Sequence, residues 1–464
     1  MDSFRQYDAI VIGSGQGGTP LSMALAKAGM RTALIERKHV GGTCINEGCT
    51  PTKTMIASGR VAYLVRRAAD YGVNVGSIGV DFEKVRQRKR AIVDSFRGGS
   101  EKRIQETENL DLLFGEASFS APLTVIVRSR HDAERMLAAR HIFINAGTRA
   151  SRPALEGLDQ VSALDNESIM ELGTVPEHLV ILGGGYIGLE FGQLFRRLGS
   201  RVTIVQSGDQ LLAREDPDVA EEVTKILRQD GIDVLLNAKA THVDQSGAIV
   251  RLEIGGPEGA TFVAGSHLLV AVGRTPNTDS LNLASAGIQT DERGFIHVND
   301  RLETSAEGVY AMGDIKGGPA FTHISYDDFR IVRDNVLEKK EASTKDRQVP
   351  YCVFTDPQLG RIGMTENEAR AQGRNIRIAK LPMTSVARAL EIDETRGFMK
   401  AVVDQETNQI LGAAVLGIEG GEVMAVLQTA MMAKLAYTAL RDATFAHPTL
   451  AESLNNLFMA MDNV

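Results

Sequence analysis

The sequence predicts an α/β protein made of two similar parallel-sheet units and a third, C-terminal α+β unit. Two observations carry this prediction. A strand, glycine turn, helix and strand pattern occurs twice, and the C-terminal quarter alternates strand and helix patterns without such a turn. The length of 464 residues agrees with several domains, because single hydrophobic cores stop growing beyond about 250–300 residues.

The first unit begins with an apolar run, residues 7–12, that is typical of a buried parallel strand. Gly13, Gly15 and Gly18 follow in a GxGxxG turn, and after a helical pattern a second apolar run ends at Glu36. Glycines at this spacing let the backbone approach a pyrophosphate at a helix N-terminus, and an acid after the second strand binds ribose hydroxyls. We therefore expect a Rossmann-like dinucleotide-binding domain.

The same pattern recurs 170 residues later, with Gly183, Gly185 and Gly188 in the turn. One GxGxxG is weak evidence, but two with matching flanks and the same internal spacing strongly indicate a second dinucleotide-binding unit. Gln206 occupies the position that matches Glu36 of the first unit. Because a carboxylate there would repel the 2′-phosphate of NADP, glutamine modestly favours NADPH over NADH, although no arginine follows to attract the phosphate.

Two of the three cysteines, Cys44 and Cys49, lie in a glycine-rich segment, residues 41–53. Thr50 and Pro51 are typical of an N-cap followed by the first helical residue. Cys49 is therefore expected at a helix N-terminus, where the backbone dipole stabilises a thiolate.

A disulfide between these cysteines requires non-helical backbone between them, and Asn46 and Gly48 make such a bend plausible. The segment predicts a redox dithiol beside an electron donor. A structural disulfide or half of a metal site is less favoured, because the spacing is not CxxC, and no metal is expected. Cys352 lies in an apolar strand pattern and is expected to be a buried core thiol.

Composition excludes several classes of partner. The 51 basic and 59 acidic residues give a net charge of −8 without long charged blocks, so neither nucleic acid nor an anionic membrane is an expected partner. No stretch has the length and apolarity of a membrane span, and the N-terminus lacks the layout of a signal peptide. Few cysteines, two of them poised for redox chemistry, favour a cytoplasmic location.

The units also suggest domain boundaries. Two matching endings, each an apolar strand followed by glycine, close the two nucleotide units at residues 141–147 and 267–273. A polar linker then precedes the C-terminal domain. The expected organisation is a first nucleotide domain, a second one, a return to the first and a C-terminal interface domain: residues 1–148, 149–275, 276–348 and 349–464.

In combination, these motifs resemble the class I pyridine nucleotide-disulfide oxidoreductases, the family of glutathione reductase, dihydrolipoamide dehydrogenase and mercuric reductase. The resemblance covers essentially the whole chain. It rests on both glycine turns, the cysteine segment, and residues 183–190, 271–278, 313–314 and 447–452. It implies an enzyme whose first unit binds FAD, whose second unit binds NAD(P)H, and whose C-terminal domain forms a homodimer.

The resemblance also implies two sets of cofactor contacts. For FAD they are Gly13, Gly15, Gly18, Glu36, Gly42, Thr43, Lys53, Ala117, Gly147, Asp314 and Thr322. For NAD(P)H they are Gly183, Gly185, Tyr186, Gly188, Gln206, Gly273 and Arg274. Lys53 would lie near the flavin N5, paired with Glu190, where a cation stabilises the negative charge of reduced flavin.

The family chemistry assigns roles to the remaining residues. Hydride passes from the nicotinamide to the flavin, and two electrons then move to the Cys44–Cys49 disulfide. Cys49 would face the flavin as a charge-transfer thiolate, and Cys44 would be the interchange thiol that attacks substrate. His447 would be the acid/base, oriented by Glu452, and in the family this pair reaches the dithiol from the other subunit.

The expected acceptor is a disulfide or a small sulfur-reactive oxidant. Residues 312–333 and 447–458 are similar to the reactive-chlorine resistance flavoproteins and hypothiocyanous acid reductases of bacteria. Mercuric reductase is disfavoured, because it delivers metal to a C-terminal cysteine pair and Cys352 is the last cysteine here. Dihydrolipoamide dehydrogenase is an alternative that Gln206 mildly opposes. A non-catalytic flavin-based redox sensor is the alternative from another class.

Overall fold

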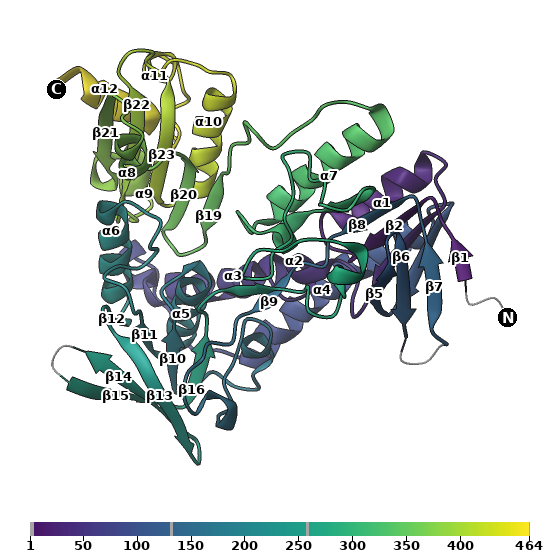
Figure 1. Cartoon of the computed structure of the whole chain (residues 1–464). Helices are drawn as coiled ribbons and strands as arrows, with labels where there is room; N and C mark the ends of the chain where they lie inside the picture. The colour runs from purple at the N-terminus through teal and green to yellow at the C-terminus, as the bar shows by residue number, and fades with distance from the viewer. Residues whose placement is uncertain (1–3, 130–132, 257–258, 464) are drawn as a thin grey trace. The chain divides into compact units, whose positions relative to one another are not determined.

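The computed structural model describes residues 4–129, 133–256 and 259–463 (Figure 1). The chain divides into two compact units, each assembled from three segments. The first unit contains Met1–Met55, Glu83–Ser151 and Gly273–Arg347, and the second contains Ile56–Phe82, Arg152–Val272 and Gln348–Val464. The predicted α/β class is confirmed, as both units are built on sheets with packed helices.

The core of the first unit is a five-stranded parallel sheet in the order β18-β8-β2-β3-β4. Its strands are β2 (Ala9–Ile12), β3 (Thr32–Glu36), β4 (Leu110–Phe114), β8 (His141–Ile144) and β18 (Val309–Ala311). Strands β2 and β3 are buried along their whole length, as a parallel sheet covered on both faces requires. Helix α1 (Gly18–Lys27) packs on β2, β3 and α7 (Thr322–Glu338).

Smaller elements complete this unit. A second sheet joins β1 (Phe4–Gln6), β7 (Arg135–Ala138), β6 (Thr124–Arg128) and β5 (Glu116–Ala121). Strands β9 (Thr148–Ala150) and β17 (Arg274–Pro276) form an antiparallel pair. The redox segment contributes α2 (Gly42–Asn46) and the start of α3 (Cys49–Arg66), which continues into the second unit, while α4 (Phe82–Gln105) begins there and ends in the first.

The second unit repeats the nucleotide-binding arrangement. A parallel sheet in the order β12-β11-β10-β16 contains β10 (His178–Leu182), β11 (Arg201–Val205), β12 (Asp233–Leu235) and β16 (His267–Val270). Helix α5 (Tyr186–Leu198) follows β10 and ends at Gly199, whose φ of +119° is a left-handed C-cap. Helix α6 (Pro217–Gln229) precedes β12. An antiparallel meander follows β12 and consists of β13 (Lys239–Ser246), β14 (Ile249–Gly256) and β15 (Gly259–Gly265).

The C-terminal part of this unit is an antiparallel five-stranded sheet, ordered β19-β20-β23-β22-β21. The strands are β19 (Tyr351–Val353), β20 (Gln358–Gly363), β21 (Ile376–Pro382), β22 (Phe398–Asp404) and β23 (Ile410–Gly417). The helices are α8 (Glu366–Ala371), α9 (Ala387–Glu391), α10 (Gly420–Met432), α11 (Tyr437–Arg441) and α12 (Ser453–Met459). Helix α10 packs on β20 and β23, and every residue of β22 is buried.

Two local expectations need correction. Helix α3 begins at Cys49 itself rather than after an N-cap at Thr50, because the Thr52 N–H already donates to the Gly48 carbonyl at 3.1 Å and closes the first turn. Cys352, expected in the core, is only half-buried. It lies on β19, an outer strand of its sheet, and strands at an edge are covered less completely.

No helix within the described ranges combines the length and the apolarity needed to cross a membrane.

Candidate functional site

The turn after β2 relies on close backbone contacts that only glycine permits. A Cβ on Gly18 would lie 2.0 Å from the Gly13 carbonyl oxygen, and Gly13 itself has a φ of +100°. Asn145 fixes the turn from the end of β8: its Oδ1 accepts the Gly18 N–H at 2.8 Å, and its Nδ2 donates to the Met312 carbonyl at 2.9 Å. The turn is therefore tied to the strand ends where a ligand would lie.

Glu36 ends β3 beside this turn and is 9% exposed. Its Oε2 accepts hydrogen bonds from the N–H and the hydroxyl of Ser14 at 3.1 and 2.6 Å, and its Oε1 accepts the Lys38 N–H at 2.8 Å. These bonds hold the carboxylate at the carboxyl end of the sheet, the place expected for a ribose-binding acid.

A half-buried carboxyl lies just after the end of β18. Asp314, in a short 3₁₀ turn at Gly313–Lys316, accepts a hydrogen bond from the Thr148 hydroxyl at 3.1 Å. Burial raises the pKa of the Asp314 carboxyl above its ordinary value. Gly147, beside it, has a φ of +64°, and a Cβ there would meet nothing within 4 Å. Of the other predicted FAD contacts, Ala117 is a buried core residue of β5.

These features fit an extended dinucleotide such as FAD. The glycine turn at the N-terminus of α1 matches a pyrophosphate, Glu36 matches a ribose, and the carboxyl of Asp314 matches a polyol chain that needs a fixed acceptor. The individual contacts remain predictions from the residues present.

Replacing Gly18 with alanine is expected to abolish FAD retention, since the new Cβ would meet the Gly13 carbonyl at 2.0 Å and push α1 off the turn. The flavin-to-protein absorbance ratio of the purified protein measures this loss. Gly98→Ala is the matched control, because a Cβ at that exposed position of α4 has nothing within 4 Å. Alanine there is expected to raise helix stability by up to about 1 kcal/mol. Normal flavin content in the Gly18→Ala protein would contradict the prediction.

The second turn is built in the same way. A Cβ on Gly188 would lie 2.3 Å from the Gly183 carbonyl oxygen, and Gly183 has a φ of +113°. Gln206 accepts the Gly184 N–H through its Oε1 at 3.0 Å, as Glu36 accepts the N–H of Ser14. Its Nε2 donates to the carbonyl of Gln210 at 3.2 Å. Gln206 and Glu36 therefore occupy equivalent positions in the two units, in structure as well as in sequence spacing.

The redox segment lies directly against the first turn. The Gly41 N–H donates to the Ser14 carbonyl at 3.1 Å, and a Cβ on Gly42 would lie 2.7 Å from the Cα of Gly15. Cys44 follows within α2, the chain then leaves the helix at Glu47, and Cys49 starts α3. The predicted break between the cysteines is present. The turn at Gly13–Gly18 thus anchors the helix that carries Cys44.

Both cysteines are in the thiol form in this structure, with Cys44 half-buried and Cys49 exposed. A hydrogen bond with Cys49, together with burial, raises the pKa of the Cys44 thiol, so that Cys44 keeps its proton in the dithiol form. The Sγ of Cys49 lies 3.3 Å from the hydroxyl of Thr322, the first residue of α7. Cys49 thus lies at the N-terminus of α3 and beside that of α7, and both dipoles favour negative charge on its sulfur.

His447 and Glu452, for which an acid/base role is predicted, form a hydrogen-bonded pair in the second unit. The Nδ1 of His447 lies 2.9 and 3.0 Å from the two carboxylate oxygens of Glu452. The histidine side chain is 67% exposed, and its Nε2 has no hydrogen-bond partner among the residues that the structure describes. Glu452 therefore orients the ring and leaves Nε2 available to a substrate or to another subunit.

Three further predicted residues are placed as follows. Lys53 lies on the part of α3 that belongs to the first unit, whereas Glu190 lies in the second, so their pairing remains a prediction. Glu190 is 4% exposed and accepts the Phe354 N–H at 2.9 Å. Arg274 belongs to the first unit and donates to the hydroxyl of Thr148 at 2.6 Å. Its contact with NAD(P)H remains a prediction.

Several residues that hold the site together were not predicted from the sequence. Ser14 and Asn145 bind the glycine turn, and the fully buried Asp328 accepts the Gly313 N–H at 2.7 Å. Lys316 and Arg347 neutralise Asp328 at 3.4 and 2.6 Å. No spacing rule connects these positions. The one signal that could have indicated Asp328 is its polar side chain within the apolar helical pattern of residues 322–333.

The chain matches known families along most of its length. The family model described as pyridine nucleotide-disulphide oxidoreductase matches residues 7–328, and the dimerisation-domain model of the same family matches residues 349–458. The chain therefore carries a dimerisation domain in its C-terminal part.

Individual relatives agree with this match. The chain is 40% identical to the probable pyridine nucleotide-disulfide oxidoreductase RclA of Escherichia coli, covering 98% of this chain and 99% of that protein. It is 33% identical to a mercuric reductase of Lysinibacillus sphaericus (98% and 83% covered) and 30% identical to a dihydrolipoyl dehydrogenase of Bacillus subtilis (98% and 98% covered). The solved structure of the HOCl-induced flavoprotein disulfide reductase RclA from E. coli superposes with a TM-score of 0.89 at 39% identity, covering 98% and 99%. The chain belongs to the pyridine nucleotide-disulphide oxidoreductase family and is an FAD- and NAD(P)H-dependent enzyme.

Proposed function

We propose that this enzyme uses NAD(P)H to reduce a small sulfur-reactive oxidant such as hypothiocyanous acid, or a disulfide, and that Cys44 is the atom that attacks it. The observation that carries the proposal is the Cys44–Cys49 dithiol, set against the first nucleotide turn. The only other cysteine, Cys352, lies on β19 of the other unit, so no second pair can relay electrons further. The full-length similarity to a protein named as an HOCl-induced flavoprotein disulfide reductase supports this acceptor class.

Bound FAD supplies a carrier that accepts hydride from a nicotinamide and returns an electron pair to a disulfide. The first glycine turn, Glu36 and Asp314 would hold it, and the second turn with Gln206 would hold NAD(P)H. Thr322 and the N-termini of α3 and α7 stabilise negative charge on Cys49.

The raised pKa of Cys44 means that the attacking thiol needs a base. His447, oriented by Glu452, is the group that we assign to this step. By analogy with the family, the histidine would act on the dithiol of the partner subunit, which makes a homodimer the active form. This proposal explains why the ring is exposed in a single protomer.

Reduction of the acceptor by the dithiol then takes two steps. The Cys44 thiolate attacks the sulfur of the acceptor, and the first leaving group departs with a proton from the histidine. The Cys49 thiolate next attacks the Cys44 sulfur, which forms the Cys44–Cys49 disulfide and expels the second leaving group. With hypothiocyanous acid the two leaving groups are water and thiocyanate. With a disulfide they are a thiol and then a thiolate, which takes its proton from solvent.

An acceptor panel tests the proposal. The holoenzyme is reduced anaerobically with NADPH or NADH and mixed with hypothiocyanite, glutathione disulfide, lipoamide or Hg²⁺. We expect rapid NAD(P)H oxidation with hypothiocyanite and little with glutathione disulfide, and the reverse order would overturn this acceptor. Reduction of NAD⁺ by dihydrolipoamide would instead identify a dihydrolipoamide dehydrogenase. A yellow protein that reduces none of these acceptors would support a redox sensor.

Nicotinamide preference gives a further prediction. Gln206→Glu keeps an acceptor for the Gly184 N–H but adds a negative charge where a 2′-phosphate would lie. We expect the ratio of kcat/KM for NADPH to that for NADH to fall roughly tenfold, mainly through the KM for NADPH. Steady-state kinetics with both nucleotides measure the ratio. Gln245→Glu on the β13–β14 hairpin is the control, and an unchanged ratio in Gln206→Glu would contradict the assignment.

We also propose a reducing, cytoplasmic setting and small-molecule partners rather than nucleic acid or membranes. Two redox thiols among only three cysteines support the setting, and a net charge of −8 without long basic blocks supports the absence of polyanionic partners.

A further inference from the structure

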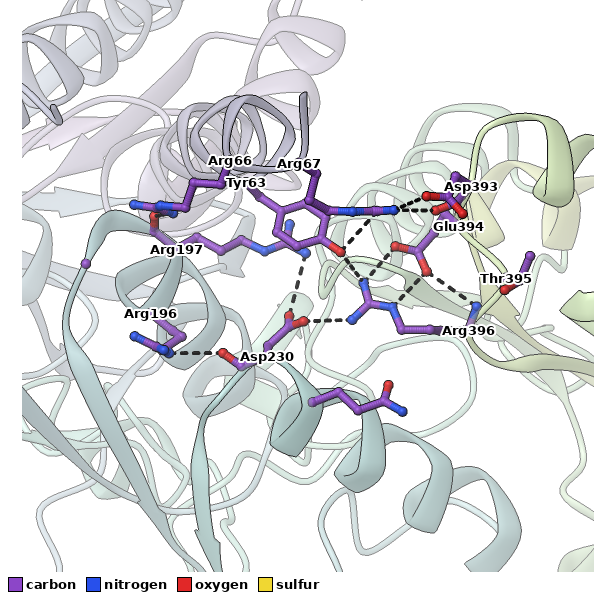
Figure 2. A pocket seen from close by; sticks show the side chains of 12 residues that line it. Tyr63, Arg66, Arg67, Arg196, Arg197, Asp230, Asp393, Glu394, Thr395 and Arg396 are labelled. Carbon is purple, nitrogen blue, oxygen red and sulfur yellow. Dashed lines mark hydrogen bonds and ion pairs between the residues drawn. The ribbon is translucent and has the colours of Figure 1, made fainter. Parts of the chain in front are cut away.

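A cavity of about 600 Å³ lies in the second unit, and its lining includes none of the residues assigned to catalysis (Figure 2). Its walls come from the C-terminal ends of α3 and α5, the end of α6 and the segment 393–396. The volume falls within the range of small-molecule sites. Five arginines line it: Arg66, Arg67, Arg196, Arg197 and Arg396.

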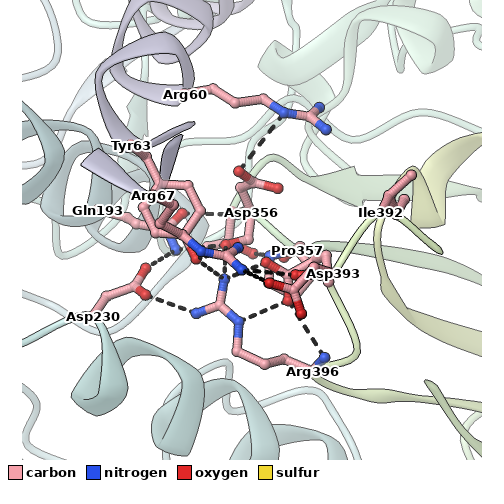
Figure 3. Close-up of polar contacts among 12 residues, drawn as sticks. Arg60, Tyr63, Arg67, Gln193, Asp230, Asp356, Pro357, Ile392, Asp393 and Arg396 are labelled. Carbon is pink, nitrogen blue, oxygen red and sulfur yellow. Dashed lines mark hydrogen bonds and ion pairs between the residues drawn. The ribbon is translucent and has the colours of Figure 1, made fainter. Parts of the chain in front are cut away.

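Three of these arginines are neutralised by carboxylates, and Figure 3 shows two of them, Arg67 and Arg396. Arg396 pairs with Glu394 and Asp230, each at 2.7 Å, and Arg67 pairs with Asp393 and Asp70. The third, Arg197, pairs with Asp356 at 2.5 Å, and its guanidinium lies 4.0 Å from the centre of the Tyr63 ring. These pairs join α3, α5 and the 393–396 segment into one framework.

The other two arginines have no such partner. Arg66 donates to the carbonyl of Arg197, and Arg196 donates to the carbonyls of Asp230 and Ser200 at 3.0 and 3.3 Å. Within the described part of the chain, no carboxylate lies within ion-pair distance of either one. Figure 2 shows both on the same side of the cavity as Arg197, away from Asp393 and Glu394.

A buried donor lies on this same side. Arg197 is 5% exposed, and its Nε has no hydrogen-bond partner among the residues described. This Nε is closed off from solvent, so Arg197 belongs to the framework beneath the cavity wall. The wall itself presents two guanidinium groups, those of Arg66 and Arg196, without a counter-charge.

We propose that this cavity binds a small phosphorylated metabolite, with its phosphate held between Arg66 and Arg196. A phosphate monoester carries close to two negative charges at neutral pH, which matches two cations without a counter-charge, whereas a carboxylate supplies one. Guanidinium groups also bind phosphate oxygens in a bidentate manner. The carboxylates of Asp393 and Glu394 on the other side disfavour a ligand that is anionic along its whole length.

The ligand is distinct from the acceptor of the redox reaction. Helix α3 begins at Cys49 and ends at Arg66, and eighteen helical residues span about 27 Å. A ligand at its C-terminal end cannot reach the sulfur at its N-terminal end. The inference is thus independent of the acceptor proposed above.

Calorimetric titration of the FAD-loaded protein with inorganic phosphate tests the site, with NADP⁺ present to fill the second nucleotide turn and acetate as a monoanion for comparison. We expect phosphate to bind more tightly than acetate. Arg66→Gln and Arg196→Gln should each weaken phosphate binding at least tenfold, which corresponds to about 1.4 kcal/mol. Arg201→Gln is the matched control, because this exposed arginine pairs with Asp233 outside the cavity. The Arg201→Gln protein should bind phosphate as tightly as the unaltered protein does.

Three results would overturn the proposal: no phosphate binding by the unaltered protein, equal binding of phosphate and acetate, or undiminished phosphate binding in Arg66→Gln. The Arg66 variant is decisive if Arg196→Gln fails to fold. Arg66 is exposed and makes a single backbone hydrogen bond, so its replacement should leave the framework intact.

Discussion

Replacing Cys44 with serine is expected to stop turnover with every acceptor, by roughly 10³-fold or more, while FAD and NAD(P)H binding stay intact. The reason is that the hydroxyl of serine neither ionises near neutral pH nor forms a disulfide with Cys49. Retained binding is expected because the segment is held by the contacts of Gly41 and Gly42 with the first turn, which do not involve the Cys44 sulfur. Acceptor-dependent NAD(P)H oxidation and flavin content measure the two effects.

The matched control is Cys352→Ser. This third thiol is half-buried on β19 and belongs to the other unit, so its loss should leave turnover unchanged. Cys49→Ser should also be inactive, and the two-electron-reduced protein should lose its long-wavelength absorbance, which reports a thiolate beside the flavin. Substantial acceptor reduction by Cys44→Ser would show that electrons leave the protein elsewhere.

Replacing His447 with glutamine is expected to lower acceptor turnover by about 10²- to 10⁴-fold, the usual contribution of a positioned acid/base. The raised pKa of Cys44 leaves the thiol protonated, and glutamine cannot remove the proton. Glu452→Gln should give a smaller loss, because the ring keeps a hydrogen-bond partner but not the negative charge that stabilises its protonated form. Stopped-flow reoxidation of the reduced enzyme by acceptor measures the step directly.

His242→Gln is the control for this prediction. His242 also lies near a glutamate, Glu156, at 3.8 Å, but it belongs to the meander of the second unit. The His242→Gln variant should therefore keep the acceptor turnover of the unaltered protein. Mixed dimers then decide which subunit supplies the base. A dimer of one Cys44→Ser and one His447→Gln protomer retains a complete site only if the histidine serves the partner's dithiol. Recovery of activity on mixing is expected, and continued inactivity would place the histidine in its own protomer.

Much of the nucleotide-binding architecture could be predicted from the sequence because its rules are local. Gly13 and Gly183 each need a positive φ, Gly18 and Gly188 each need the absence of a Cβ, and Glu36 and Gln206 follow at fixed distances. The period-2 and period-3.6 apolar patterns around them define the flanking strands and helices. These constraints act within about 25 residues, so one chain is enough to reveal them.

The redox site was predictable in its residues but not in its electrostatics. The spacing of Cys44 and Cys49 shows a dithiol, but it does not show which sulfur keeps the proton. That depends on the hydrogen bond with Cys49 and on the burial of Cys44, which only the folded chain brings about. Thr322 likewise is far from Cys49 in the sequence and reaches its sulfur because α7 packs beside α1. The start of α3 was misplaced for a related reason, since the Gly48 carbonyl competes successfully with the side chain of Thr50 for the first turn.

The sequence by itself determined the fold class, the two dinucleotide turns, the dithiol and the family, because each depends on short-range stereochemistry that glycine, cysteine and apolar periodicity express directly. Only the tertiary structure decided how those parts are held and what else the chain can bind. Asn145 on the glycine turn and the uncompensated Arg66 and Arg196 in the cavity depend on contacts between segments far apart in the chain. The physical reason is that the role of a charged side chain depends on its neighbours in the fold. An arginine beside a carboxylate holds the structure together, whereas an arginine with no carboxylate nearby can bind an anionic ligand.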